Sequence, residues 1–151
     1  MTRLSGSLVN FLPVDLELID LLDDEKEAIR ECAGFFEMLG RSVVWDEQWC
    51  GTLYVKGLPW LIGGYWAVAP GVFQVFMIPS VQALSQPIAL ARYVREWVAA
   101  IEKLGGHRLQ TYSLPIPRIR RWMESLGFAC EGTLRRYTKA GQDYEIWGKV
   151  K

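Results

Sequence analysis

The C-terminal end of the chain constrains the fold more than any other stretch, because a helix signal, a helix stop and a hairpin signal follow one another there. The segment RWMESLGF spaces apolar residues along one face of a helix and ends on Leu-Gly-Phe. Gly127 supplies the left-handed conformation that closes a helix, and Phe128 returns the chain to the core. The sequence therefore predicts a helix over 117–126, followed by a β-hairpin formed by 128–137 and 143–150.

Two other patterns describe the rest of the chain. Residues 87–103 repeat apolar side chains at helical spacing and stop at Gly105-Gly106. Between 43 and 78, aromatic and β-branched runs are broken by turn pairs such as Lys56-Gly57, which predicts antiparallel strands. The remaining predicted elements are strands at 8–12, 45–55, 59–68, 72–78 and 108–113, a helix that opens at Pro13 and Asp15, a second helix over 23–39, and a loop between Ser80 and Pro87.

The resulting order of elements, βααβββαβαββ, predicts an α/β protein with a mixed, mostly antiparallel sheet and helices on both faces. A chain of 151 residues has the length of about one domain, so we expect a single domain over 1–151.

Charge and cysteine usage exclude several classes of protein. Seventeen basic and seventeen acidic residues cancel, so we expect neither a nucleic acid nor a membrane as partner. The three cysteines are widely spaced and His107 is the single histidine, so no metal site is expected. No apolar stretch approaches the roughly 20 residues that cross a bilayer. We therefore expect a soluble, cytoplasmic protein.

The C-terminal segment, RWMESLGFACEGTLRRY followed by GQDYEIWGKV, resembles the last third of the GNAT acyl-CoA N-acyltransferase superfamily. The middle segment, YVKGLPWLIGGYWAVAPGVFQVFMIPS, resembles the second to fourth strands of the same superfamily, so the resemblance runs from Trp49 to the end of the chain. Within the superfamily it is nearest to the small GNAT-like proteins encoded by tailed phages and prophages. The resemblance implies acetyl-CoA as cofactor and transfer of its acetyl group to an amine.

Active members of this superfamily hold the cofactor's pyrophosphate with backbone N–H groups of an Arg/Gln-x-x-Gly-x-Gly/Ala loop that opens a helix. The corresponding stretch here is Gln82–Pro87, where Ser85 replaces a glycine and Pro87 lacks the N–H donor. A second interpretation needs no ligand, because Ser85 can be the N-cap of the helix and Pro87 can lie in its first turn. The cofactor-binding residues implied by the resemblance are Phe76, Met77, Ile78, Gln82, Ser85, Gln86, Ile88 and Ala89.

The catalytic positions of the superfamily are poorly matched. The general-base glutamate of the fourth strand maps to Gln74, which cannot accept a proton at a useful pKa. The general-acid tyrosine maps to Met123, and the asparagine that follows the fifth strand falls near Ile116. Other side chains could act as the general acid or base, but each of them is also explained as a polar group at the surface or at the edge of the sheet. These side chains are Tyr137 and Tyr144, followed by Tyr112, Asp143 and His107.

Two functions stay open at this point. The first is an N-acetyltransferase with a degenerate cofactor loop, acting on a small-molecule or protein amine. The second is a GNAT-fold protein without catalysis, such as a phage accessory or virion-associated protein, which works through a protein partner or as a homodimer. A cluster of arginines also has two interpretations. The arginines either bind the 3′-phosphate of coenzyme A or form a solvent-exposed face. The cluster consists of Arg118, Arg120, Arg121, Arg135 and Arg136.

Overall fold

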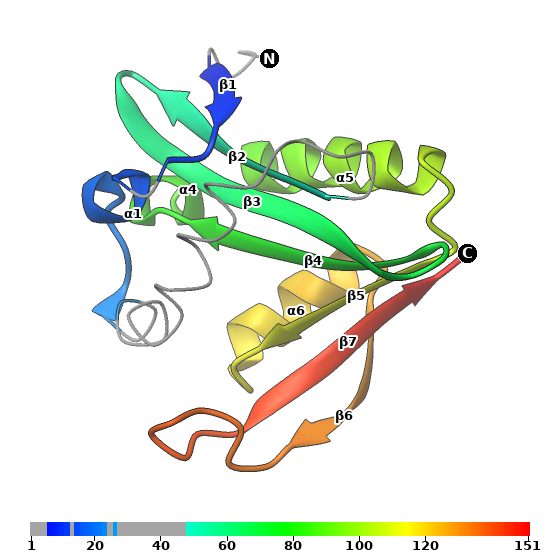
Figure 1. The fold of residues 1–151 in the computed structure, drawn as a ribbon. Coiled ribbons are helices and arrows are strands. Elements are labelled where there is room, and N and C mark those ends of the chain that lie inside the picture. The colour runs from blue at the N-terminus through cyan, green and yellow to red at the C-terminus, as the bar shows by residue number, and fades with distance from the viewer. Residues whose placement is uncertain (1–5, 13, 24–25, 27–47) are drawn as a thin grey trace. The chain divides into compact units, whose positions relative to one another are not determined.

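The computed structural model describes residues 6–12, 14–23, 26 and 48–151. Seven strands form a sheet in the order β1-β2-β3-β4-β5-β7-β6, with β4 and β5 parallel and the pairs β1–β2, β5–β7 and β6–β7 antiparallel. The elements are β1 (Gly6–Asn10), α1 (Asp15–Leu18), β2 (Gln48–Val55), β3 (Leu58–Ala69), β4 (Val72–Pro79), α4 (Val81–Leu84), α5 (Pro87–Lys103), β5 (Arg108–Ser113), α6 (Pro117–Ser125), β6 (Ala129–Leu134) and β7 (Tyr144–Val150) (Figure 1). The predicted fold class, a mixed α/β sheet of mostly antiparallel strands, is confirmed.

The chain forms two compact units, and β3, β4 and α5 contribute residues to both. The N-terminal unit contains 1–65 and 77–90. Its edge strand β1 pairs with β2 from Gly6↔Val55 to Asn10↔Gly51. The segment after α1 reaches α4, because the N–H of Val81 donates to the carbonyl of Asp20 at 2.8 Å. Its buried apolar side chains are Phe11, Ile19, Leu21, Leu53, Trp60, Leu61, Ile62, Ile78, Ala83 and Leu90.

The C-terminal unit contains 66–76 and 91–151. Helix α6 lies along β5 and β7 (Figure 1). Lys149 of β7 pairs with Glu102 of α5 at 2.7 Å, and Glu145 of β7 pairs with Arg120 of α6 at 2.7 Å. Because side chains four residues apart on a strand share a face, both helices pack on one face of β7. The buried apolar side chains of this unit are Phe73, Val75, Val94, Val98, Ile101, Leu109, Met123, Leu126, Phe128 and Trp147.

Several predicted boundaries are corrected. The first strand is Gly6–Asn10 instead of 8–12, and the loop predicted before Pro87 contains the short helix α4. The strand predicted over 128–137 ends at Leu134 as β6, and Arg136, with φ of 53°, leaves the extended conformation. The helix predicted over 23–39 and the start of the strand predicted from 45 lie outside the described residues.

Candidate functional site

The parallel ladder between β4 and β5 is short. It joins Val72, Phe73 and Gln74 to Arg108, Leu109 and Gln110, whereas β4 runs on to Pro79 and β5 to Ser113. The backbone groups of the later β4 residues are therefore not used in this ladder. Of the predicted cofactor residues on β4, Phe76 and Met77 are half-buried and Ile78 is buried.

The segment in which the resemblance implies a phosphate-binding loop begins with α4. Ser80 is fully buried and caps this helix, because its hydroxyl accepts from the N–H of Ala83 at 3.0 Å. Ser85 is not the N-cap of α5, as one interpretation predicted. It is the C-cap of α4, and its hydroxyl donates to the carbonyl of Gln82 at 2.6 Å. Pro87 does lie in the first turn of α5.

These bonds occupy the donors that a diphosphate would need. The N–H of Ser85 donates to the carbonyl of Val81 at 3.1 Å, and the N–H of Gln86 donates to that of Ala83 at 3.0 Å. Pro87 has no N–H. The side-chain amide of Gln82 donates to the carboxylate of Asp20 at 3.2 Å.

Ile88 and Ala89 are left as the donors of this segment, because the first N–H groups of an α-helix have no partner inside the helix. Ile88 is 73% exposed and Ala89 is half-buried. The residues therefore fit acetyl-CoA in part. The first turn of α5 and the later residues of β4 suit the group, whereas the Ser85–Pro87 turn does not suit its diphosphate.

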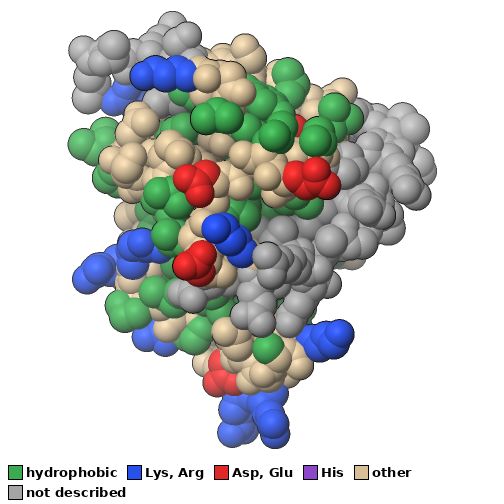
Figure 2. Space-filling view, turned by 90° about the vertical axis from the view of Figure 1, so that its left-hand side faces the viewer, with side chains coloured by type: hydrophobic (Ala, Val, Ile, Leu, Met, Phe, Trp, Pro, Cys, Tyr) green, Lys and Arg blue, Asp and Glu red, His purple; other side chains and the backbone are tan. Residues whose placement is uncertain are grey.

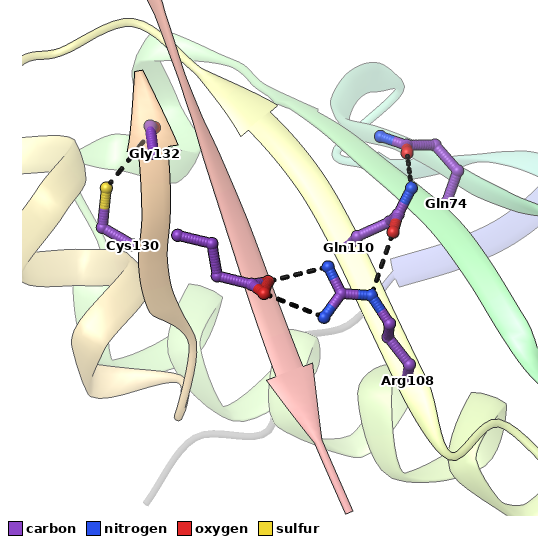
Figure 3. Close-up of polar contacts among 6 residues, drawn as sticks. Gln74, Arg108, Gln110, Cys130 and Gly132 are labelled. Carbon is purple, nitrogen blue, oxygen red and sulfur yellow. Dashed lines mark hydrogen bonds and ion pairs between the residues drawn. The ribbon is translucent and has the colours of Figure 1, made fainter. Parts of the chain in front are cut away.

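A row of polar side chains crosses four strands of the C-terminal unit (Figure 3). The amide nitrogen of Gln110 donates to Oε1 of Gln74 at 3.2 Å, and Nε of Arg108 donates to Oε1 of Gln110 at 3.1 Å. Arg108 also donates two bonds to Glu131 of β6, at 3.0 and 2.7 Å. The hydrogen bond to Arg108 lowers the pKa of Glu131, and the same bond raises the pKa of Arg108.

Gly148 of β7 makes room for this row. It lies between β5 and β6, opposite Gln110 on one side and Ala129 on the other. A Cβ added there would lie 2.7 Å from Cδ of Glu131 and 2.9 Å from Nη1 of Arg108. Only a glycine therefore lets the Arg108–Glu131 pair cross the strand without a shift.

The predicted candidates Tyr137 and Tyr144 lie together with Tyr112. The ring centroids of Tyr112 and Tyr137 are 5.6 Å apart, and those of Tyr137 and Tyr144 are 5.5 Å apart. Tyr137 is 53% exposed and the other two are half-buried. The loop that carries Tyr137 is held by the N–H of Tyr137, which donates to the carbonyl of Gln142 at 2.8 Å.

The N-terminal unit holds a separate polar cluster around Asp15, which is 2% exposed. Its carboxylate accepts from the N–H of Leu12 at 2.9 Å, from the hydroxyl of Thr52 at 2.7 Å and from the hydroxyl of Tyr54. The bond to Asp15 raises the pKa of Tyr54 to about 12, with burial and the charge of Asp15 adding to it. Burial, and then Asp15, raises the pKa of the Cys50 thiol to about 12, which disfavours the thiolate that a nucleophile needs.

The basic residues divide into two groups. Arg120 is bonded to Glu145, and this bond raises its pKa. Figure 2 shows exposed Lys and Arg side chains at its lower end. The two views differ by a turn about the vertical axis, and Figure 1 draws the β6–β7 loop at the same height. The exposed basic residues of that loop are Arg135, Arg136 and Lys139.

Two kinds of feature are absent from the described part of the chain. No helix there is long and apolar enough to cross a membrane. No group of three or more His, Cys, Asp or Glu side chains there is placed to hold a metal ion.

The sequence analysis missed the partners of Gln74 and the Asp15 cluster. Arg108 and Gln110 alternate along a predicted strand, which put them on one face, but no spacing rule joins them to Glu131 on another strand. In the same way, Thr52 and Tyr54 alternate on β2, while their common partner Asp15 lies far away in the sequence.

Comparison with known proteins agrees with this geometry at the level of the fold. No family model matches the chain, and no curated protein matches its sequence. Among solved structures, Ard1 from Thermoplasma volcanium matches with a TM-score of 0.75 at 11% identity, covering 96% of this chain and 97% of that one. A spermidine N-acetyltransferase SpeG chimera from Vibrio cholerae and hSSAT matches with a TM-score of 0.74 at 14% identity, covering 96% and 95%.

A third similar structure is the ribosomal-protein-S18-alanine N-acetyltransferase from Escherichia coli, with a TM-score of 0.69 at 15% identity and coverage of 97% of this chain and 94% of that one. The structure of an acetyltransferase of the GNAT family from Streptococcus pneumoniae matches with a TM-score of 0.65 at 14% identity, covering 97% of this chain and 100% of that one. The chain therefore has the GNAT fold along almost its whole length. At these identities the likeness defines the fold and leaves the activity to the site.

Proposed function

We propose that the chain is a GNAT-type N-acetyltransferase that transfers the acetyl group of acetyl-CoA to an amine, with a degenerate cofactor loop. The observation that carries the proposal is the short β4–β5 ladder within a GNAT fold. It leaves the later backbone groups of β4, around Phe76–Ile78, outside that ladder. An extended pantetheine arm pairs with a strand through such groups.

The proposed reaction is a direct attack of the amine on the thioester carbonyl, in which a C–N bond forms and the C–S bond breaks. Acetyl-CoA, when bound, would supply the activated acetyl group, and its sulfur would need a proton as the C–S bond breaks. Gln74 cannot act as the base, so the amine must enter in its neutral form, and the proton that its nitrogen loses after the C–N bond forms passes to water. Tyr137 and Tyr144 are the candidates that donate a proton to the cofactor's sulfur.

A thiol-release assay with acetyl-CoA and a panel of polyamines and peptides tests this function. We expect release that depends on the amine, and a Tyr137→Phe or Tyr144→Phe variant that lowers the rate by about 10²–10⁴-fold, the usual contribution of an acid catalyst. The two variants keep the aromatic rings and so serve as controls for each other. Thiol release that no amine stimulates would exclude the proposal.

A second candidate function is a GNAT-fold protein without catalysis, which works through protein contacts as a phage accessory or virion-associated component or as a homodimer. The specific observation in its favour is that Ser85 and Gln86 donate their N–H groups inside the chain. It predicts a folded chain that does not bind acetyl-CoA. Light scattering on the purified protein would reveal a homodimer, and a saturable affinity for acetyl-CoA would exclude this candidate. The first candidate function places the protein in the cytoplasm, and the second allows the virion.

A further inference from the structure

Gln74 is a buried polar side chain at the last rung of the β4–β5 ladder. Gln74 is 5% exposed, and it lies opposite Gln110 in the ladder. Its Oε1 accepts a hydrogen bond, whereas its Nε2 has no acceptor among the residues that the structure describes. The fully buried polar atoms left without a partner in those residues lie elsewhere, for example Ser113 Oγ, so Nε2 of Gln74 is not fully shielded from solvent.

The direction of the Gln74 amide is dictated by its neighbours. An arginine can only donate, so the atom of Gln110 that faces Nε of Arg108 must be the oxygen. The nitrogen of Gln110 then faces Gln74, and the atom of Gln74 that receives this bond must also be the oxygen. Figure 3 shows the nitrogen of Gln74 on the side away from Gln110.

The origin of this direction is the ion pair at the other end of the row. Glu131 binds both terminal nitrogens of Arg108, and such a bidentate pair fixes the guanidinium in its plane. The remaining N–H of Arg108, on Nε, is thereby aimed at Gln110. Each amide in turn has a single orientation that satisfies its neighbour.

We propose that Arg108 and Gln110 are positioning residues that present the amide N–H of Gln74 as a donor for a carbonyl or carboxylate oxygen of a ligand. Water can reach this donor, and a ligand oxygen held at the same place would take over the hydrogen bond that water makes. The chemistry suits the carbonyl of an acetyl thioester or the carboxylate of acetate. The inference rests on the proposed function only for the thioester, since any ligand oxygen of this kind would serve.

Gln110→Glu is the sharpest test, because it leaves Gln74 untouched and preserves the shape of residue 110. A carboxylate at 110 still accepts from Arg108 but has no N–H for Gln74, so Gln74 must turn its nitrogen inward and present its oxygen. Gln142→Glu, at an exposed position, is the control for the added charge. Gln74→Leu identifies the Gln74 amide resonances in the spectrum of the ¹⁵N-labelled full-length protein.

Three probes are titrated while the Gln74 amide resonances are followed by NMR: sodium acetate, acetyl-CoA and free coenzyme A. We expect a saturable shift with acetate and acetyl-CoA and none with coenzyme A. The affinity for acetate should fall by about tenfold or more in Gln110→Glu, the size expected when a hydrogen bond to a charged group is lost. The affinity in Gln142→Glu should match the wild type.

Gln74 resonances that respond to neither acetate nor acetyl-CoA would overturn the inference, as would an unchanged response in Gln110→Glu. An equal shift with coenzyme A would also overturn it, because that molecule lacks the acyl oxygen. A response to acetate without any response to acetyl-CoA supports the inference and contradicts the proposed function, so the two failures are distinguishable.

Discussion

The turn at Ser80–Ala89 and the polar row from Gln74 to Glu131 differ in whether their hydrogen-bond donors have acceptors among the described residues. In the turn, the N–H groups of Ser85 and Gln86 donate to carbonyls of their own short helix. In the row, four side chains are joined end to end and the last one keeps a donor without an acceptor among the described residues. The difference teaches that two segments of one fold can differ in whether a hydrogen-bond donor remains for a ligand. In this GNAT fold the N–H groups of Ser85 and Gln86 bond within the chain, and Gln74 lies at the last rung of the β4–β5 ladder.

Gly148→Ala should have the largest effect on the polar row, because the added Cβ takes the space that the Arg108–Glu131 pair crosses. The added Cβ meets the flexible ends of Arg108 and Glu131, which can turn away from each other, so we expect the loss of this ion pair and a decrease of at most about 1 kcal/mol in the free energy of unfolding. Urea denaturation measures the loss. Gly132→Ala on β6 is the matched control, since its nearest neighbour would be Cγ2 of Ile146 at 3.8 Å, an ordinary contact. Equal losses in the two variants would contradict the role of Gly148.

Asp15→Asn tests whether the buried carboxylate of Asp15 stabilises the N-terminal unit. It is the counterpart of the Arg108–Glu131 pair in the C-terminal unit. An asparagine has one accepting oxygen and one donating nitrogen, so it cannot accept all the bonds from Leu12, Thr52 and Tyr54. We expect a loss of about 2 kcal/mol in the free energy of unfolding. Asp20→Asn, at an exposed residue, should change it by less than about 0.5 kcal/mol. A smaller effect at position 15 than at position 20 would overturn the assignment.

Within the turn, Ser80→Ala and Ser85→Ala should differ. Ser80 is buried and caps α4, so its loss should cost about 1 kcal/mol. Ser85 is exposed and its hydroxyl only adds a bond to Gln82, so its loss should cost less than about 0.5 kcal/mol. Thermal melting of both variants checks the order. The reverse order would restore Ser85 as the N-cap of α5.

The smallest effect concerns Tyr54 at high pH. Its pKa in the folded protein is about 12, above the ordinary value of 10.0, mainly because of its bond to Asp15. A raised pKa means that this contribution to stability is complete below pH 10.0 and is lost as the pH rises through 12. The difference between absorbance titrations of the wild type and Tyr54→Phe should therefore reveal a late-titrating tyrosine. Asp15→Asn should move that titration to lower pH, and an unmoved titration would separate the two residues.

The sequence predicted the elements that depend on local signals. The helix over Pro117–Ser125, its glycine stop and strand β5 at Arg108–Ser113 follow from apolar spacing and cap residues, and the structure has them at or within a residue of the predicted bounds. Helix α4 was not predicted, because four residues are too few to show a helical spacing of apolar side chains.

The candidate site was predicted less well, for a physical reason. Ser85 has the side chain of an N-cap and stands two residues before Pro87, yet Gln86 lies between them and α4 takes Ser85 as its C-cap. Gln74 was recognised as a neutral residue in a base position. Its orientation depends on Arg108 and Glu131, which reach it from other strands, and sequence spacing holds no information about contacts across a sheet.

The most direct test of the central claim is isothermal titration calorimetry with acetyl-CoA and with acetyl-pantetheine, which lacks the nucleotide and its diphosphate. If the turn is closed and the acyl end is retained, the wild type should bind the two molecules with affinities within about tenfold, or about 1.4 kcal/mol, of each other. A Ser85→Gly, Pro87→Gly double variant should then gain affinity for acetyl-CoA alone. Wild-type binding of acetyl-CoA about 100-fold tighter than that of acetyl-pantetheine, or no binding of either molecule, would contradict the account.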